Sequence, residues 1–232
     1  MKKLIAGNWK MNGSRSDNAD LLMAIVAGLP AGACDVVVCP PALFVADVLQ
    51  AVQGSVILVG SQDVSAAEKG AFTGELSAAM LHEYGVRFAI VGHSERRQFH
   101  GESDAMVGAK AQAALAKGVI PIVCVGETLE QREAGETQAV VKRQLAAAIH
   151  AVGHCVSEIV VAYEPVWAIG TGQTATPEQA QEVHAVLRAQ LSAATEKANA
   201  VRIVYGGSMN AVNATSLLAQ PDYYRGLIGR TY

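Results

Sequence analysis

The chain alternates short apolar runs with longer amphipathic segments, and this alternation restricts the possible folds more than any other feature. Most of the runs are rich in valine and isoleucine and lack polar residues at alternate positions. That pattern is typical of strands buried on both faces of a parallel sheet. We count eight such runs, at residues 4–6, 36–39, 56–60, 88–91, 119–125, 159–163, 202–205 and 226–229.

Segments with helical spacing lie between the runs, at residues 18–29, 42–52, 104–117, 138–152, 177–197 and 211–219. Thr176 followed by Pro177 marks a helix start, since threonine caps helices and proline suits the first helical position. Repeated strand–helix units without a change of composition predict a single α/β domain over residues 1–232. Eight units favour a closed (β/α)8 barrel over an open doubly wound sheet.

Charge and cysteine content exclude several classes of function. The net charge is −3 and no cluster of lysine and arginine stands out, so we expect no nucleic-acid partner. No apolar run approaches the ~20 residues of a membrane span, so we expect no membrane association. The four cysteines lack metal-ligand spacing, and Cys39 and Cys124 lie in apolar runs. These features predict a soluble cytoplasmic protein with reduced thiols and no metal.

His93 follows a predicted strand and Gly92, and it is followed at once by residues that start helices. Ser94 is the expected N-cap and Glu95 belongs to the first turn. The positive end of a helix disfavours imidazolium, so His93 is expected to stay neutral and to donate a hydrogen bond. Taken alone, a histidine in this position is better explained as a core or capping residue, and only the other motifs of the chain favour a catalytic role.

Asn8 and Lys10 directly follow the first predicted strand. A lysine in that position can hold an anionic substrate, or its amine can form a Schiff base. The simpler alternative is a lysine whose stem covers apolar surface while its ammonium reaches water.

Glu164 ends the sixth strand, where a carboxylate is costly unless it is paired or functional. Pro165 favours extended geometry at Glu164. The following residues combine apolar bulk with Gly170 and Gly172, which predicts a lid over a site. An ordinary loop with one exposed tryptophan is the alternative.

Glycines after strands seven and eight, at 206, 207 and 229, allow close approach of a ligand, and Ser208 adds a hydroxyl. Backbone N–H groups there suit a phosphate. With such a cradle, Glu164 can remove a proton next to a carbonyl that His93 polarises, while Lys10 and Asn8 stabilise the enediolate. This chemistry is aldose–ketose isomerisation of a small phosphosugar, and it requires neither metal nor organic cofactor.

Six motifs in family order resemble the triosephosphate isomerase family: GNWKMN at 7–12, the run 60–75, GHSERR at 92–97, CVGE at 124–127, AYEPVWAIGTG at 162–172 and YGGS at 205–208. The resemblance implies a TIM barrel that interconverts glyceraldehyde 3-phosphate and dihydroxyacetone phosphate as a homodimer. It implies His93 as electrophile and Glu164 as base, with Glu95 and Cys124 in supporting positions. The implied substrate contacts are Asn8, Lys10, Gly170, Ser208, Gly229 and Arg230, and the implied dimer contacts are Gln62 and Thr73.

The end of the sequence departs from the family pattern. Arg230 stands where the family usually has a second glycine, and the sequence stops at Tyr232, so we expect the final helix to be missing. These departures leave two alternatives to an active isomerase. One is another phosphate-binding barrel enzyme, such as a Schiff-base aldolase that uses Lys10. The other is a catalytically impaired homologue with a binding or structural role.

Overall fold

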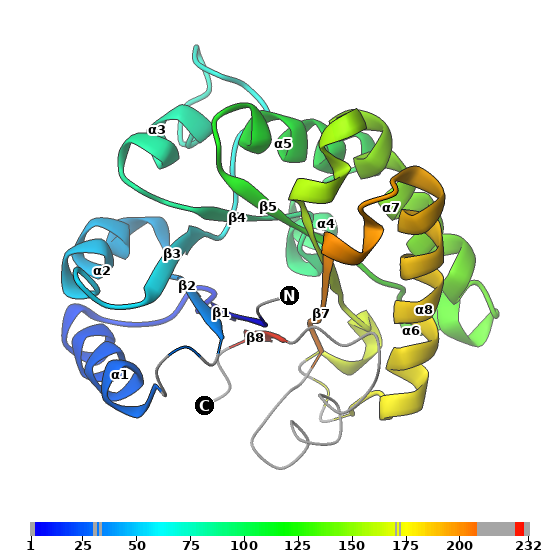
Figure 1. Cartoon of the computed structure of the whole chain (residues 1–232), viewed down its shortest axis with the longest axis horizontal. Coiled ribbons are helices and arrows are strands. Elements are labelled where there is room, and N and C mark those ends of the chain that lie inside the picture. The colour runs from blue at the N-terminus through cyan, green and yellow to red at the C-terminus, as the bar shows by residue number, and fades with distance from the viewer. Residues whose placement is uncertain are drawn as a thin grey trace.

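The computed structural model describes residues 3–29, 32, 34–169, 171, 173–207 and 226–229. All eight predicted strands are confirmed, and they form one parallel sheet in the order β7-β6-β5-β4-β3-β2-β1-β8. A parallel bridge between Tyr205 and Gly226 joins the two ends of the sheet, which closes the predicted barrel (Figure 1). The strands are β1 (Leu4–Asn8), β2 (Asp35–Cys39), β3 (Ile57–Ser61), β4 (Phe88–Val91), β5 (Ile120–Val125), β6 (Val160–Tyr163), β7 (Arg202–Tyr205) and β8 (Leu227–Gly229).

The helices surround the strands (Figure 1). In the described part of the chain, the α-helices are α1 (Arg15–Gly28), α2 (Val45–Ala51), α3 (Ala78–Glu83), α4 (Ser94–His100), α5 (Asp104–Ala116), α6 (Leu129–Glu133), α7 (Thr137–Val152) and α8 (Pro177–Ala194). Short 3₁₀ turns are η1 (Ala42–Phe44), η2 (Gly153–Glu158), η3 (Val166–Ala168) and η4 (Ala198–Ala200). None of the described helices is long and apolar enough to cross a membrane.

Helix ends differ from the predictions where a cap decides them. The α1 helix begins at Arg15, not at residue 18, because the Ser14 side chain accepts a hydrogen bond from the Asp17 N–H. The α8 helix starts at Pro177 behind Thr176, as predicted, but it ends before the extended residue Thr195. The predicted helix at residues 42–52 is divided into η1 and α2. The predicted helix at 211–219 lies outside the described residues, as do residues 230–232.

The central strands, such as β4 and β6, bury both faces, which explains their continuous apolar sequences, whereas β1 and β8 include half-buried residues. One set of alternate residues fills the barrel interior: Leu4, Ala6, Val37, Cys39, Phe88, Ile90, Ile122, Cys124, Val160, Ala162, Val204 and Leu227. The intervening residues, such as Val38, Val91 and Val123, belong to a second apolar cluster with the helices. Burial of each large apolar side chain contributes about 1.5–3 kcal/mol. This two-sided packing fixes the strand ends, where the polar residues of the candidate site begin.

Candidate active site

Predicted catalytic residues from separate strands meet at the carboxyl-terminal ends of the barrel strands. Asn8 ends β1, His93 follows β4 and Glu164 follows β6. A cavity of about 360 Å³ opens beside Asn8 and His93. It is lined by Asn8, Lys10, Met11, Gln62, His93, Glu95, Arg96, Phe99 and His100. Glu164 is buried next to this cavity, in contact with His93.

His93, and not Ser94, is the N-cap of α4, so the predicted cap was wrong by one residue. The His93 Nδ1 atom accepts a hydrogen bond from the Glu95 backbone N–H, with an N···N distance of 3.2 Å. A ring nitrogen that accepts a hydrogen bond carries no proton, so the proton of a neutral imidazole lies on Nε2. The backbone of α4 therefore selects the neutral tautomer that points its N–H away from the helix.

The two carboxylate oxygens of Glu164 differ in their hydrogen bonds. Its Oε2 accepts a hydrogen bond from the Ser94 N–H at 2.9 Å. Its Oε1 lies 3.1 Å from His93 Nε2 but makes no hydrogen bond to the described residues, so the contact is close without being aligned. The side chain is only 2% exposed. A buried carboxylate oxygen close to the imidazole Nε2 suits proton abstraction.

Two glycines allow the main chain to pack against Glu164. A Cβ atom at Gly126 would lie 1.6 Å from the Glu164 carbonyl oxygen, and one at Gly206 would lie 2.8 Å from Glu164 Cγ. The Glu164 N–H also donates to the carbonyl of Val125 at 2.7 Å. Sequence reasoning assigned Gly206 to ligand approach and missed Gly126, because neither packing contact is visible in the chain itself.

Lys10 adopts a left-handed backbone conformation with φ of 50°. Such a conformation costs a non-glycine residue roughly 1–2 kcal/mol, so other contacts must hold it. The Lys10 N–H donates to Asn8 Oδ1 at 3.0 Å, and Gln62 Nε2 donates to the Lys10 carbonyl at 2.8 Å. The ammonium pairs with Glu95 at 2.5 Å. Lys10 is thus a fixed cation at the cavity, held by Glu95.

Cys124 lies beside Glu164 in the barrel interior. Burial, reinforced by the neighbouring Glu164 carboxylate, raises the pKa of the Cys124 thiol well above its ordinary value. The thiol therefore stays protonated and adds no second negative charge next to the base.

Glu127 anchors the beginning of the predicted lid, a contact that sequence reasoning did not assign. Its carboxylate is fully buried and accepts hydrogen bonds from Trp167 Nε1 at 2.9 Å, Tyr163 Oη at 3.1 Å and Arg132 Nη1 at 3.1 Å. The Val166 N–H donates to the Glu127 carbonyl. Trp167 is therefore held by a buried charge at the start of the lid.

Trp167→Phe is expected to destabilise the protein while keeping an aromatic ring in place. The change leaves a buried carboxylate with one donor fewer, and hydrogen bonds to charged groups are worth about 1.5–3 kcal/mol. A chain of this size should then lose about 3–10 °C in Tm. Thermal unfolding followed by circular dichroism measures the loss, with Tyr163→Phe as a matched variant that removes another donor to Glu127. An unchanged Tm in both variants would contradict the anchoring role.

Of the other predicted site residues, Gly229 and Gln62 lie beside the catalytic cavity and Thr73 lies on a separate loop. Gly229 pairs with Asn8 across β8 and β1, and a Cβ there would lie 3.3 Å from Lys10 Cε. Gly170, Ser208 and Arg230 lie outside the described residues. Thr73 is exposed on the long loop at residues 62–77, which extends beyond α3 and α5 in Figure 1. Gln62 holds the Lys10 carbonyl within its own chain, an internal contact that sequence reasoning missed.

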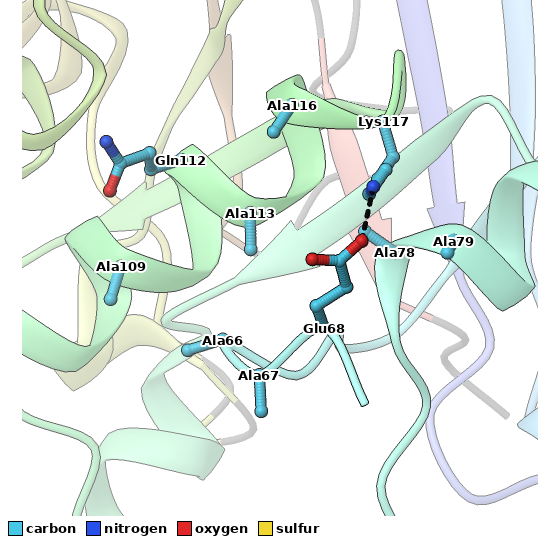
Figure 2. Close-up of a pocket in the computed structure, with 10 residues that line it drawn as sticks. All are labelled: Ala66, Ala67, Glu68, Ala78, Ala79, Ala109, Gln112, Ala113, Ala116 and Lys117. Atoms are coloured by element: carbon cyan, nitrogen blue, oxygen red, sulfur yellow. Dashed lines mark hydrogen bonds and ion pairs between the residues drawn. The ribbon is translucent and has the colours of Figure 1, made fainter. Parts of the chain in front are cut away.

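Another cavity, of about 370 Å³, lies between residues 66–68, α3 and α5 (Figure 2). Alanine side chains form most of its wall, and Lys117 pairs with Glu68 across it at 2.6 Å. None of the predicted site residues lines it. The described residues also hold no group of three or more His, Cys, Asp or Glu side chains arranged to bind a metal. The strand-end cavity, lined by Asn8, Lys10 and His93, is the candidate site.

The family profile described as triosephosphate isomerase matches residues 3–232. The chain belongs to this family. It is 67% identical over 231 residues to the triosephosphate isomerase of Paracidovorax citrulli (strain AAC00-1), a match that covers 98% of this chain and 92% of the relative. The triosephosphate isomerases of Delftia acidovorans and Albidiferax ferrireducens are 66% and 63% identical over 229 and 228 residues, with the same coverage.

Membership of the triosephosphate isomerase family confirms the resemblance and the fold derived from the sequence. The similarity extends over nearly the whole chain, so it includes every strand that carries a predicted site residue. It favours the isomerase interpretation over the Schiff-base aldolase and over the impaired homologue.

Proposed function

We propose that this chain catalyses the interconversion of D-glyceraldehyde 3-phosphate and dihydroxyacetone phosphate. The observation that carries the proposal is the position of the buried Glu164 carboxylate, whose Oε1 lies 3.1 Å from His93 Nε2. Lys10 supplies a fixed positive charge at the adjoining cavity. Family membership and three relatives named triosephosphate isomerase support the same reaction.

The reaction is a proton transfer through an enediolate. Glu164 removes a proton from the carbon next to the substrate carbonyl, and the C–H electron pair becomes the C=C bond of the enediolate. His93 donates its Nε2 proton to the carbonyl oxygen and recovers a proton from the neighbouring hydroxyl. Glu164 then returns its proton to the adjacent carbon, so acid and base both regain their starting states. Lys10 and Asn8 stabilise the negative oxygens of the intermediate.

Phosphate binding is proposed for the residues around the other strand ends. Gly229 is the described member of this group, and its missing side chain leaves room next to Lys10. Gly170, Ser208 and Arg230 complete the group in our proposal. A lid that begins at Val166 and Trp167 excludes water from the intermediate. A coupled assay with either triose phosphate tests the function directly, and a purified chain without turnover would overturn it.

Borohydride trapping separates the isomerase from an aldolase that forms a Schiff base. The Lys10 ammonium pairs with Glu95 at 2.5 Å, and a protonated amine held by a carboxylate is not a nucleophile. We expect no mass increase at Lys10 after treatment with dihydroxyacetone phosphate and borohydride. Peptide mass spectrometry reports the result, and an adduct at Lys10 would support the aldolase instead.

A homodimer in a reducing, cytoplasmic environment is part of the proposal. Large apolar side chains are exposed around the cavity and the long loop at residues 62–77, among them Met11 (95% exposed), Phe72, Met80, Tyr84 and Phe99. Exposed apolar surface of this kind marks interfaces. Thr73 of the partner subunit would then approach the catalytic cavity. All four cysteines are free thiols, which suits the compartment.

The dimer is tested by its mass in solution. Light scattering after size exclusion should give twice the chain mass of 24.2 kDa. Phe72→Asp places a charge on the loop that the proposal buries, so this variant should elute as a monomer. Glu133→Lys also changes the charge of an exposed residue, but at α6, and it should remain dimeric. A wild-type chain with the mass of one subunit would contradict the proposal.

A further inference from the structure

We propose that Arg97 is a positioning residue that fixes the distance between His93 and Glu164. This inference rests on the proposed isomerase function and extends it to a residue that does not touch the substrate cavity. Arg97 lies in α4, and its side chain is 17% exposed. It acts through two backbone carbonyl groups, that of Gly92 next to His93 and that of Cys124 near Glu164.

The Arg97 guanidinium makes three directed contacts. Its Nε donates to the Gly92 carbonyl at 2.9 Å, and its Nη2 donates to the Cys124 carbonyl at 3.2 Å. Its Nη1 donates to Asp104 Oδ1 at 2.6 Å. A planar group with five N–H donors on three nitrogens can reach these three separated acceptors at once, whereas the donors of an ammonium all extend from a single nitrogen.

The Cys124 carbonyl belongs to β5 and the Gly92 carbonyl directly follows β4, at the point where the pairing of the two strands stops. Strands β4 and β5 pair residue by residue from Phe88 with Ile120 to Val91 with Val123. The next pair in this register would be Gly92 with Cys124. Arg97 donates to both carbonyls at that position, so it replaces the missing hydrogen bonds between the strand ends.

Each of the two carbonyl groups is linked to a catalytic residue through the neighbouring backbone. Gly92 precedes His93, and its φ of +67° sets the direction in which the chain enters α4. Cys124 precedes Val125, whose carbonyl accepts the Glu164 N–H at 2.7 Å. A shift of either strand end therefore changes the separation of His93 Nε2 from Glu164 Oε1.

Neighbouring helices hold the guanidinium in place. Asp104 is the first residue of α5, and its second carboxylate oxygen accepts a hydrogen bond from Arg143 Nε of α7 at 2.9 Å. Arg143 thus shares the carboxylate with Arg97, but the donors to the two strand carbonyls come from Arg97. This difference provides a matched control for the experiment.

Arg97→Lys separates positioning from stability. Lysine keeps the positive charge opposite Asp104 but cannot reach both carbonyls, so we expect kcat to fall by about tenfold to a hundredfold. KM should stay within about twofold, because ground-state binding is unchanged. The affinity for 2-phosphoglycolate, whose carboxylate imitates the enediolate, should fall in parallel with kcat. The affinity for sn-glycerol 3-phosphate, which lacks the carbonyl, should not.

Two controls distinguish a loss of positioning from a loss of folded protein or of the Asp104 contact. Rates are normalised to the concentration of sites that bind sn-glycerol 3-phosphate, so loss of folded protein does not imitate loss of turnover. Arg143→Met should keep kcat within about twofold of wild type, because the strand carbonyls keep their donor. Wild-type kcat in Arg97→Lys, or an equal loss in Arg143→Met, would overturn the inference while leaving the proposed function intact. A wild-type chain without turnover would overturn both.

Discussion

Shortening Glu164 to aspartate is expected to lower kcat by at least about a hundredfold, since a misplacement of about 1 Å costs that much. The carboxylate of Glu164→Asp is withdrawn by one methylene from the position that Oε1 occupies beside His93. The Ser94 N–H that holds Oε2 makes the loss larger, because the shorter side chain cannot keep this bond and still reach the substrate. Steady-state kinetics in both directions measure the effect.

Substrate binding should survive the Glu164→Asp change. The proposed phosphate contacts belong to other strands, so the affinity for sn-glycerol 3-phosphate should stay within about threefold of wild type. Glu133→Asp, at an exposed position of α6, shortens a carboxylate away from the site and should leave turnover unchanged. Turnover of Glu164→Asp equal to wild type would remove Glu164 from the role of base.

The strands could be predicted because their environment leaves a clear trace in the sequence. A strand covered on both faces, such as Phe88–Val91, needs apolar residues at every position, and few structures besides a buried strand produce so short an apolar run. The predicted ends of α1 and α8 were wrong because single residues decide them. Ser14 begins α1 with a side-chain hydrogen bond, and extended backbone at Thr195 ends α8, and neither changes the apolar spacing.

The site was predictable as a set of residues and unpredictable in its hydrogen bonds. Asn8, His93 and Glu164 each lie at or just after a strand end, and a closed parallel barrel brings such positions to one rim. The sequence does not reveal that Gln62 supports Lys10 or that Glu127 binds Trp167, since these partners are 52 and 40 residues apart. Long-range contacts of this kind depend on the closed barrel, and the chain order alone contains no signal for them.

The N-cap of α4 was also wrongly predicted from the sequence, although its hydrogen bond joins residues close together in the chain. Serine is a common N-cap, so Ser94 was the natural prediction, yet the His93 ring accepts the Glu95 N–H and Ser94 begins the helix. This one-residue difference in the cap also affects the chemistry of His93. Because the cap bond occupies Nδ1, the structure of α4 determines which His93 nitrogen faces Glu164 with a proton.

His93→Asn should therefore separate the capping role of His93 from its catalytic role. Asparagine is among the best N-cap residues, so α4 should keep its cap and Tm should change by less than about 3 °C. Its amide cannot reach the position of Nε2 and cannot give up a proton as imidazole does. Loss of a positioned acid typically costs about 10²–10⁴-fold, so we expect kcat to fall by about a hundredfold or more.

His93→Gln provides the matched comparison because it loses the cap geometry as well. Its kcat should fall as in His93→Asn, and loss of the cap should remove about 1 kcal/mol of stability in addition. Calorimetry and steady-state kinetics on the two variants then distinguish the roles. If His93→Asn retains wild-type turnover, His93 is a capping histidine and another group must polarise the carbonyl. If both variants turn over slowly and only His93→Gln loses Tm, one imidazole ring caps α4 through Nδ1 and transfers protons through Nε2.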